Sequence, residues 1–312
     1  RIGIQDVVPV KEQEMPDGNF PTCPYPNPEI REALERGIAL CEQVKPDLLL
    51  ATDPDADRVG IAVKDGDDYQ LLTGNETGAL LFDYICRMRS QLGKMPARPL
   101  AVTTIVSTSI VDAIAADHGV ELKRVLTGFK YIGGIQRELE EAGELDRFIF
   151  GFEESYGYLA GCHARDKDAI VASMLICQMA RAYRSEGMNL YQAMQALYQK
   201  YGYHHNRTLA FTFEGASGAA RMAEIMDSLR ADGLDSVAGK AVLETLDYQP
   251  GLGMLPPANV IEFDLEDSCK VIVRPSGTEP KIKVYLFTTG ASMEDARGVG
   301  DELAEALNVL FQ

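Results

Sequence analysis

Three aspartates at every second position are the most constraining feature of this 312-residue chain. Asp53, Asp55 and Asp57 lie between two short apolar runs, residues 48–51 and 59–63, which predicts a loop that joins two buried strands. In an extended loop alternate side chains point the same way, so we expect the three carboxylates to converge. Converging carboxylates repel one another unless a cation lies between them, and hard oxygen ligands favour Mg²⁺ or Ca²⁺.

Two other interpretations compete with a metal site in this loop. A solvated acidic turn fits the same residues and stays open on spacing alone. An EF-hand is excluded, because its sixth and twelfth positions require Gly and Glu, whereas Arg58 and Lys64 stand there. The cationic Arg58 directly after the third aspartate indicates that a further anion, such as a phosphate, accompanies the metal.

The net charge of the chain limits the classes of partner that it can bind, and its length limits the number of domains. A formal net charge of −17 argues against nucleic acid and anionic membranes, since both require a basic surface. At 312 residues with 46% hydrophobic content, the chain is long enough for two or three domains. No signal peptide is visible, and the most apolar stretch, residues 169–180, is too short to cross a membrane. We expect a cytoplasmic protein that binds small molecules.

The cysteines and the chain ends add two expectations. The six cysteines are scattered without a Cys-x-x-Cys pair, which is typical of free thiols in a reducing compartment and argues against zinc. The sequence starts at Arg1 without Met and ends in Asn-Val-Leu-Phe-Gln, which resembles the remnant of a protease-cleaved tag. Both ends therefore indicate an engineered fragment of a longer protein.

Two patterns of secondary structure follow one another along the chain. Strand and helix patterns alternate up to about residue 183, which predicts an α/β fold with a parallel or mixed sheet. The predicted helices are 29–43, 78–89, 110–117, 131–141 and 169–183, and the predicted strands are 48–51, 59–63, 100–106, 121–125 and 147–150. After Gly202, strands at 208–213, 260–264, 270–273 and 281–288 between helices at 218–230 and 293–307 predict an α+β layer with an antiparallel sheet.

A glycine-containing loop between two of these later strands is suited to an anion. Residues 274–280 read Arg-Pro-Ser-Gly-Thr-Glu-Pro. Gly277 permits a backbone that turns N–H groups inward, Ser276 and Thr278 add hydroxyl donors, and Arg274 adds a planar cation. A decorated β-turn stays open as the alternative. A Walker loop is excluded, because no Gly-Lys-Ser/Thr follows.

Two further loops carry polar groups at one edge of the earlier, predicted parallel sheet. In Gly-Phe-Glu-Glu-Ser-Tyr-Gly at 151–157, Glu153 and Ser155 are spaced to point to one side, where a carboxylate and a hydroxyl suit vicinal sugar hydroxyls. Acidic residues that cap a following helix are the alternative. Lys130, His163, Arg165 and Lys167 are cations near these loops, although a surface lysine is usually only solvated.

Taken together and in order, these four loops resemble the α-D-phosphohexomutase superfamily, and the resemblance covers nearly the whole chain. It implies four domains around one cleft, a phosphorylated serine in the first domain, and Mg²⁺ held by that phosphoserine and three aspartates. It further implies that a sugar phosphate receives the phosphoryl group, reorients as a bisphosphate, and returns the other phosphoryl group to the serine.

The resemblance assigns roles to the residues of each loop. It makes Asp53, Asp55 and Asp57 the metal ligands with Arg58 in support, Glu153 and Ser155 the contacts to the sugar, and Arg274, Ser276, Gly277 and Thr278 the phosphate site. Lys130 resembles a residue of the third domain that faces the substrate. Lys130 and His163 are the candidates for the general acid and base, and histidine as a residue type is the commonest group in this role near neutral pH.

One departure from the family pattern is large. The family's serine loop reads Ser-His-Asn-Pro, and no such stretch exists among the 312 residues. We therefore expect part of the second domain at 1–72, the third at 73–203, the phosphate-binding fourth at 204–307, and a tag remnant at 308–312. Without the serine, we expect the fragment itself to be inactive.

The continuation of the sugar loop, Tyr156-Gly157-Tyr158, resembles phosphoglucomutases more than the glucosamine branch of the superfamily. That resemblance implies Mg²⁺-dependent interconversion of glucose 1-phosphate and glucose 6-phosphate through glucose 1,6-bisphosphate by the longer protein. Phosphomannomutase and phosphopentomutase activities are the near alternatives. A non-catalytic module that binds sugar phosphates or divalent metal is the alternative from another class.

Overall fold

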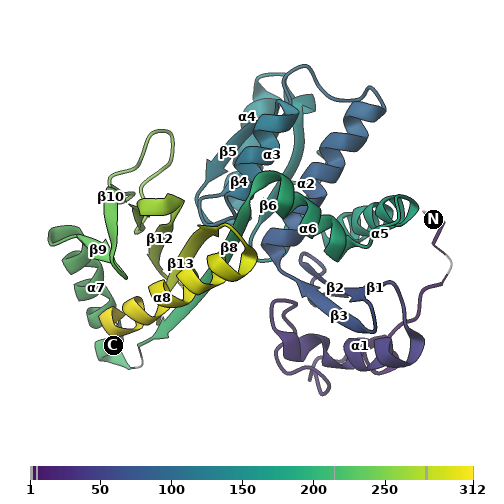
Figure 1. Ribbon diagram of the computed structural model, residues 1–312, viewed down its shortest axis with the longest axis horizontal. Coiled ribbons are helices and arrows are strands. Elements are labelled where there is room, and N and C mark those ends of the chain that lie inside the picture. The colour runs from purple at the N-terminus through teal and green to yellow at the C-terminus, as the bar shows by residue number, and fades with distance from the viewer. Residues whose placement is uncertain (1–2, 5, 214, 278–279, 312) are drawn as a thin grey trace. The chain divides into compact units, whose positions relative to one another are not determined.

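The computed structural model describes residues 1–312 except 1–2, 5, 214, 278–279 and 312 (Figure 1). The chain divides into two compact units. The first unit comprises residues 1–107 and 111–200, and the second comprises residues 108–110 and 201–312.

A small antiparallel sheet carries the three aspartates in the first unit. Its strand order is β1-β2-β3, with bounds Leu48–Thr52, Val59–Asp65 and Asp68–Leu72, and helix α1 (Arg31–Val44) packs beside it (Figure 1). As predicted, β1 and β2 flank the aspartate loop, but only β2 is buried. A cavity of ≈ 950 Å³ beside β1, lined by residues 9–28 among others, accounts for its partial exposure.

A second sheet in the same unit is mixed, within the α/β class predicted from the sequence. Strands β4 and β5 and strands β4 and β6 are parallel, whereas the short β7 pairs antiparallel to β6. The order is β5-β4-β6-β7, with bounds Glu121–Val125, Leu100–Thr104, Phe148–Glu153 and Gly157–Leu159. Strand β6 therefore extends through Glu153, so the prediction that residues 151–153 belong to a loop is wrong.

Helices surround this mixed sheet (Figure 1). Their bounds are Gly74–Gln91 for α2, Ile110–His118 for α3, Phe129–Glu141 for α4, Ala169–Ser185 for α5 and Leu190–Tyr201 for α6. Helix α2 begins with a capping box, in which Thr73 accepts from the N–H of Glu76 and the Glu76 carboxylate accepts from the N–H of Thr73. Phe129, Ile132 and Leu139 of α4 pack on Leu100 of β4 and Phe148 of β6.

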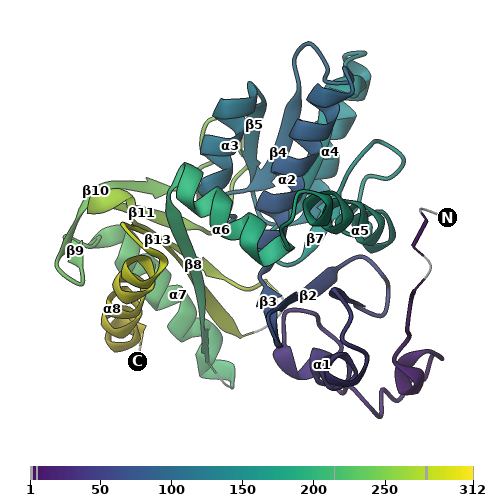
Figure 2. The same cartoon turned by 45° about the vertical axis from the view of Figure 1, so that its right-hand side comes forward.

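The second unit is an antiparallel sheet covered on one face by two helices (Figure 2). The strand order is β8-β13-β12-β11-β10-β9, with bounds Tyr203–Thr212, Lys281–Gly290, Lys270–Pro275, Ile261–Leu265, Lys240–Asp247 and Ser236–Val237. Helices α7 (Ala216–Ala231) and α8 (Met293–Phe311) share one hydrophobic core with this sheet. The predicted α+β layer is confirmed, although the sequence reasoning missed β9 and β10.

The end of α8 is packed in this core. Phe311 is 3% exposed, and its ring stacks on Phe211 with the centroids 4.8 Å apart. Helix α8 therefore continues as far as Phe311, beyond its predicted end at 307, and the tag origin expected for 308–312 stays a prediction. Among the described residues, no helix is both long and apolar enough to span a membrane.

Candidate active site

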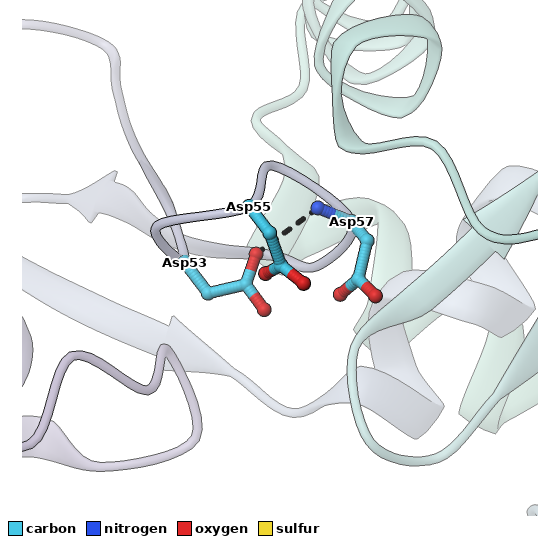
Figure 3. Close-up of side chains that lie close together, drawn as sticks. All are labelled: Asp53, Asp55 and Asp57. Carbon is cyan, nitrogen blue, oxygen red and sulfur yellow. Dashed lines mark hydrogen bonds between the residues drawn. The ribbon is translucent and has the colours of Figure 1, made fainter.

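The three aspartates converge on one side of the loop between β1 and β2 (Figure 3). One oxygen from each of Asp53, Asp55 and Asp57 lies within 4.8 Å of the other two. Asp53 also fixes the turn, because its Oδ1 accepts from the backbone N–H groups of Asp57 at 3.1 Å and Arg58 at 3.0 Å. Ala56 has a φ of 55°, a left-handed conformation that a non-glycine residue rarely adopts. The predicted convergence is thus built by a strained, internally bonded turn rather than by an extended loop.

The charges in this turn favour a divalent cation. Burial raises the pKa of Asp53, and the carboxylates of Asp57 and Asp55 raise it further, while the N–H of Arg58 opposes the shift. Asp57 Oδ1 is buried and accepts no hydrogen bond from the described residues. An orphaned carboxylate oxygen beside two other carboxylates fits the all-oxygen ligand set that Mg²⁺ prefers.

Arg58 links this turn to the N-terminal segment of the same unit. Its Nη1 donates to Glu29 Oε1 at 2.9 Å, and its Nε lies 3.9 Å from Asp53 Oδ2 and 3.8 Å from Asp57 Oδ1. The guanidinium is about one third exposed. The guanidinium therefore offsets part of the negative charge of the three carboxylates but does not occupy the place of a metal ion among them.

The predicted sugar loop is a tight hairpin between β6 and β7. Glu153 is the last residue of β6 and pairs with Gly157 at the start of β7, which leaves Ser155 in the turn. Tyr156, also in the turn, has a φ of 66°. Glu153 is 5% exposed and Ser155 is half-buried, so the two residues differ in their access to solvent.

The backbone joins the hairpin directly to the aspartate loop. The N–H of Val59 donates to the carbonyl of Tyr156 at 3.1 Å, and Arg58 forms an isolated bridge with Gly157. On its other side the hairpin rests on Gly74, where a Cβ would lie 2.0 Å from the carbonyl oxygen of Glu154. The structure thus brings two of the loops predicted from sequence into contact within one unit.

Glu153 connects the hairpin to the loop directly before helix α4, and Lys130 lies in the first turn of that helix rather than in the loop predicted from sequence. Its Oε1 accepts from the N–H of Gly128 at 2.8 Å, and burial raises the pKa of its carboxyl. Gly128 has a φ of 121°, which favours glycine. Lys130 is exposed, and its Nζ lies 4.9 Å from the centroid of the Tyr131 ring. One carboxylate oxygen of Glu153 therefore holds a loop in place.

His163 is close to the start of helix α5. Its Nε2 lies 2.8 Å from Oδ2 of Asp168, the residue that caps α5 through the N–H groups of Ile170 and Val171. Burial alone would raise the pKa of the Asp168 carboxyl. The N–H of Val171 and the imidazole of His163 outweigh this effect and hold the pKa of Asp168 below its usual value. The structure ties His163 to a helix cap, and its role as an acid or base stays a prediction.

Lys167 is the site residue that the sequence reasoning undervalued. Its Nζ contacts Asp57 Oδ2, and the side chain is only 14% exposed. Although burial opposes the shift, this contact raises the pKa of Lys167. The signal in the sequence was its place in Arg-Asp-Lys-Asp, directly before a long apolar helix.

Glu154, adjacent to Glu153, was also missed. Its Oε2 lies 3.1 Å from Thr104 Oγ1, and that hydroxyl lies 2.8 Å from Ser107 Oγ. Burial, with the neighbouring charge of Glu153, raises the pKa of Glu154 to about 7. The turn of the hairpin therefore carries a carboxyl whose pKa is raised to near neutrality.

The predicted phosphate loop lies in the second unit. Strand β12 continues to Pro275, so Arg274 is a strand residue opposite Lys283 of β13 rather than a loop residue. The N–H of Ser276 donates to the carbonyl of Lys281 at 2.7 Å. A Cβ on Gly277 would meet open space and its φ is not left-handed, so neither space nor backbone conformation demands a glycine there, and its part in an anion site stays a prediction. Thr278 lies outside the described residues.

Three family models match successive parts of the chain. Residues 1–66 match domain II of phosphoglucomutase/phosphomannomutase, residues 73–201 match domain III, and residues 220–306 match the C-terminal domain. The chain belongs to the α-D-phosphohexomutase superfamily.

Curated relatives agree with this membership of the phosphohexomutases. The chain is 36% identical over 289 residues to a phosphoglucomutase of Staphylococcus saprophyticus, covering 88% of the chain and 51% of the relative. It is 35% identical over 298 residues to a phosphoglucomutase of Staphylococcus aureus, covering 92% of the chain and 52% of the relative. The chain thus spans about half the length of the curated relatives that it matches.

Solved structures share the phosphohexomutase fold. A phosphoglucomutase/phosphomannomutase family protein from Burkholderia thailandensis has a TM-score of 0.63 at 17% identity, covering 94% of the chain and 53% of that structure. Parafusin, a Paramecium phosphoglucomutase in its open form, has a TM-score of 0.60 at 18% identity, covering 85% and 48%. At these identities the likeness concerns the fold alone.

Proposed function

We propose that the protein to which this chain belongs is a phosphoglucomutase that interconverts glucose 1-phosphate and glucose 6-phosphate. The observation that carries the proposal is the contact between the aspartate triad and the sugar hairpin, made by the Val59–Tyr156 bond within one unit. The curated relatives named phosphoglucomutase, at 35–36% identity, favour glucose phosphates over mannose or pentose phosphates. Glucose 1,6-bisphosphate is the proposed intermediate.

Each loop of the chain has a task in this proposal. Asp53, Asp55 and Asp57 hold Mg²⁺, which when bound neutralises negative charge on a transferring phosphoryl group. Arg58 and Lys167 supply further positive charge at the same place. The partial burial of Asp53, Asp57 and Lys167 strengthens their effect, because charges interact more strongly when water is excluded.

The sugar and the second phosphate are positioned by the other loops. Ser155, in the turn of the hairpin, offers a hydroxyl to the sugar, while Glu153 holds the hairpin to Gly128 and presents a carboxylate at the same edge. Arg274, with Ser276 and Gly277, binds the phosphate group that is not being transferred. Reaction requires that these groups align the sugar with a phosphoryl donor, and alignment supplies much of the rate enhancement in such transfers.

The nucleophile is proposed to be a phosphoserine of the longer protein, since the family's Ser-His-Asn-Pro stretch does not occur in these 312 residues. Lys130 and His163 are the proposed acid and base among the residues present. Variants Lys130→Ala and His163→Ala of the longer protein would each flatten one limb of the pH–rate profile. Unchanged profiles in both variants would remove them from this role.

The decisive experiment compares substrates with the longer protein. We expect the highest kcat/KM for glucose 1-phosphate against mannose, ribose and glucosamine 1-phosphates, loss of activity in EDTA, and recovery with Mg²⁺. The 312-residue chain alone should be inactive in the same assay. A preference for another sugar would replace the glucose assignment, and activity that is insensitive to EDTA would contradict the metal site.

A further inference from the structure

Lys167 occupies a specific place against the aspartate triad. Its Nζ contacts Asp57 Oδ2, and its side chain passes over Gly157 of the hairpin. A Cβ on Gly157 would lie 2.6 Å from Lys167 Cδ, so the missing side chain at that position leaves room for the lysine. The contact is thus built jointly by the aspartate loop and the hairpin.

Two backbone hydrogen bonds fix the position of the chain directly after Lys167. The N–H of Asp168 donates to the carbonyl of Tyr158 at 2.9 Å, and the N–H of Ala169 donates to the carbonyl of Ala56 at 3.0 Å. The second bond ties the first residue of α5 to the turn between Asp55 and Asp57. An ammonium group held this way cannot drift far from the triad, unlike that of an ordinary surface lysine.

The ammonium group of Lys167 and a divalent cation in the aspartate triad would both bind the carboxylate of Asp57. Asp57 Oδ2 accepts from Lys167, while Oδ1 of the same group accepts no hydrogen bond from the described residues. An ion held by the three carboxylates would be repelled by the lysine charge, because the two cations would share one carboxylate in a partly buried place. Lys167 therefore cannot act only as a supporting charge for the metal.

We propose that Lys167 and a divalent cation compete for Asp57, so that the lysine weakens metal binding and is directed toward the hairpin when the ion is bound. This inference rests on the metal site of the proposed function. The hairpin side is where Glu153 and Ser155 are expected to meet the sugar. Metal binding would thereby make a cation available to the sugar phosphate.

The test measures Mn²⁺ affinity of the 312-residue chain by calorimetry and by electron paramagnetic resonance at low salt. Lys167→Met removes the charge and keeps the length of the side chain, and it should bind Mn²⁺ roughly three- to tenfold more tightly. Gly157→Ala keeps the lysine but pushes its side chain aside, and it should tighten binding in the same direction. Lys200→Met is the matched control, because Lys200 pairs with Asp117 at 2.7 Å, outside the aspartate loop.

The outcomes separate the inference from the proposed function. Tighter binding in Lys167→Met, with Lys200→Met equal to the unmodified chain, supports competition. Equal or weaker binding in Lys167→Met overturns it, even if Mn²⁺ still binds to the triad. If Asp55→Ala does not weaken Mn²⁺ binding to the unmodified chain or to Lys167→Met, the metal site of the proposed function falls as well. Circular dichroism and the Tm of each variant establish that it is folded.

Discussion

The N–H of Val59 donates to the carbonyl of Tyr156 at 3.1 Å, and this bond joins the strand after the aspartate triad to the sugar hairpin. The two loops are 90 or more residues apart in the sequence, yet a displacement of one must be followed by the other. Metal binding and sugar binding are therefore expected to depend on shared backbone positions, as well as on the side chains that make direct contact.

Replacement of Asp55 and replacement of Asp53 should have different effects on metal binding and on stability. Asp55 is exposed, whereas Asp53 Oδ1 holds two backbone N–H groups of the turn. Asp55→Ala should weaken Mn²⁺ binding on the order of tenfold or more and leave the Tm unchanged, because affinity follows the number of charged ligands. Asp53→Ala should weaken Mn²⁺ binding and also lower the Tm. Calorimetric titration and thermal unfolding give the two readouts, and an Asp55→Ala variant that still binds Mn²⁺ fully would contradict the ligand assignment.

Glu154 should make stability depend on pH near neutrality. Its pKa is raised from 4.5 to about 7, so the folded state binds a proton that the unfolded state has released. This contribution is fully present below pH 4.5 and is lost as the pH rises through 7. Between pH 5.5 and 8 the loss is on the order of 2 kcal/mol.

The test compares the unmodified chain with Glu154→Gln, which mimics the protonated carboxyl. Because glutamine does not titrate, the free energy of unfolding of the variant should fall less than that of the unmodified chain between pH 5.5 and 8. Urea unfolding at both pH values measures the difference. Identical pH dependence of the two proteins would show that Glu154 does not titrate in this range.

Gly74 should tolerate no side chain, although it begins a helix. A Cβ there would lie 2.0 Å from the carbonyl oxygen of Glu154, a backbone atom that cannot move without displacing the hairpin. We expect Gly74→Ala to destabilise the first unit by about 2 kcal/mol or more. Gly134→Ala in α4 is the control, because its Cβ would meet open space and helix propensity should stabilise it by up to about 1 kcal/mol. A Gly74→Ala variant as stable as the control would refute the close approach.

Sequence patterns predicted this fold well where periodicity and loop chemistry agreed. The apolar runs on each side of the aspartates became β1 and β2, and strand β5 has the predicted bounds, Glu121–Val125. Short elements with weak patterns were missed, among them β3, the two-residue β9 and the three-residue β7. Such strands are specified by their neighbours in the sheet, which a single sequence does not reveal.

The candidate site was predictable only in part, for a physical reason. Asp53, Asp55 and Asp57 are close in sequence, so their convergence could be predicted from local geometry. Lys167 meets Asp57 through tertiary bonds to Ala56 and Tyr158, and nothing in its own surroundings distinguishes it from a solvated lysine. Residues that act through contacts distant in sequence are those that sequence reasoning ranked too low.

Arg274 and Lys283 stand opposite each other on β12 and β13, which offers a test of the phosphate site. Like charges at directly opposed positions of an antiparallel pair are destabilising, by roughly 0.2–1 kcal/mol. A bound phosphate would relieve that repulsion by lying between the two cations. Lys283→Met should therefore keep or slightly raise the Tm and at the same time weaken the binding of inorganic phosphate.

Lys270→Met is the matched control, because it removes a lysine from the same sheet that already has carboxylate partners. Lys270 Nζ contacts the buried Glu262 and lies 3.2 Å from Asp264 Oδ1. Its loss would leave a buried carboxylate without its cation, so stability should fall by about 3 kcal/mol while phosphate binding is unchanged. Thermal unfolding with and without phosphate distinguishes the two lysines, since only Lys283→Met should reduce the phosphate-induced rise in Tm. If Lys283→Met destabilises the sheet as Lys270→Met does, Lys283 is a structural residue and the anion must be bound elsewhere.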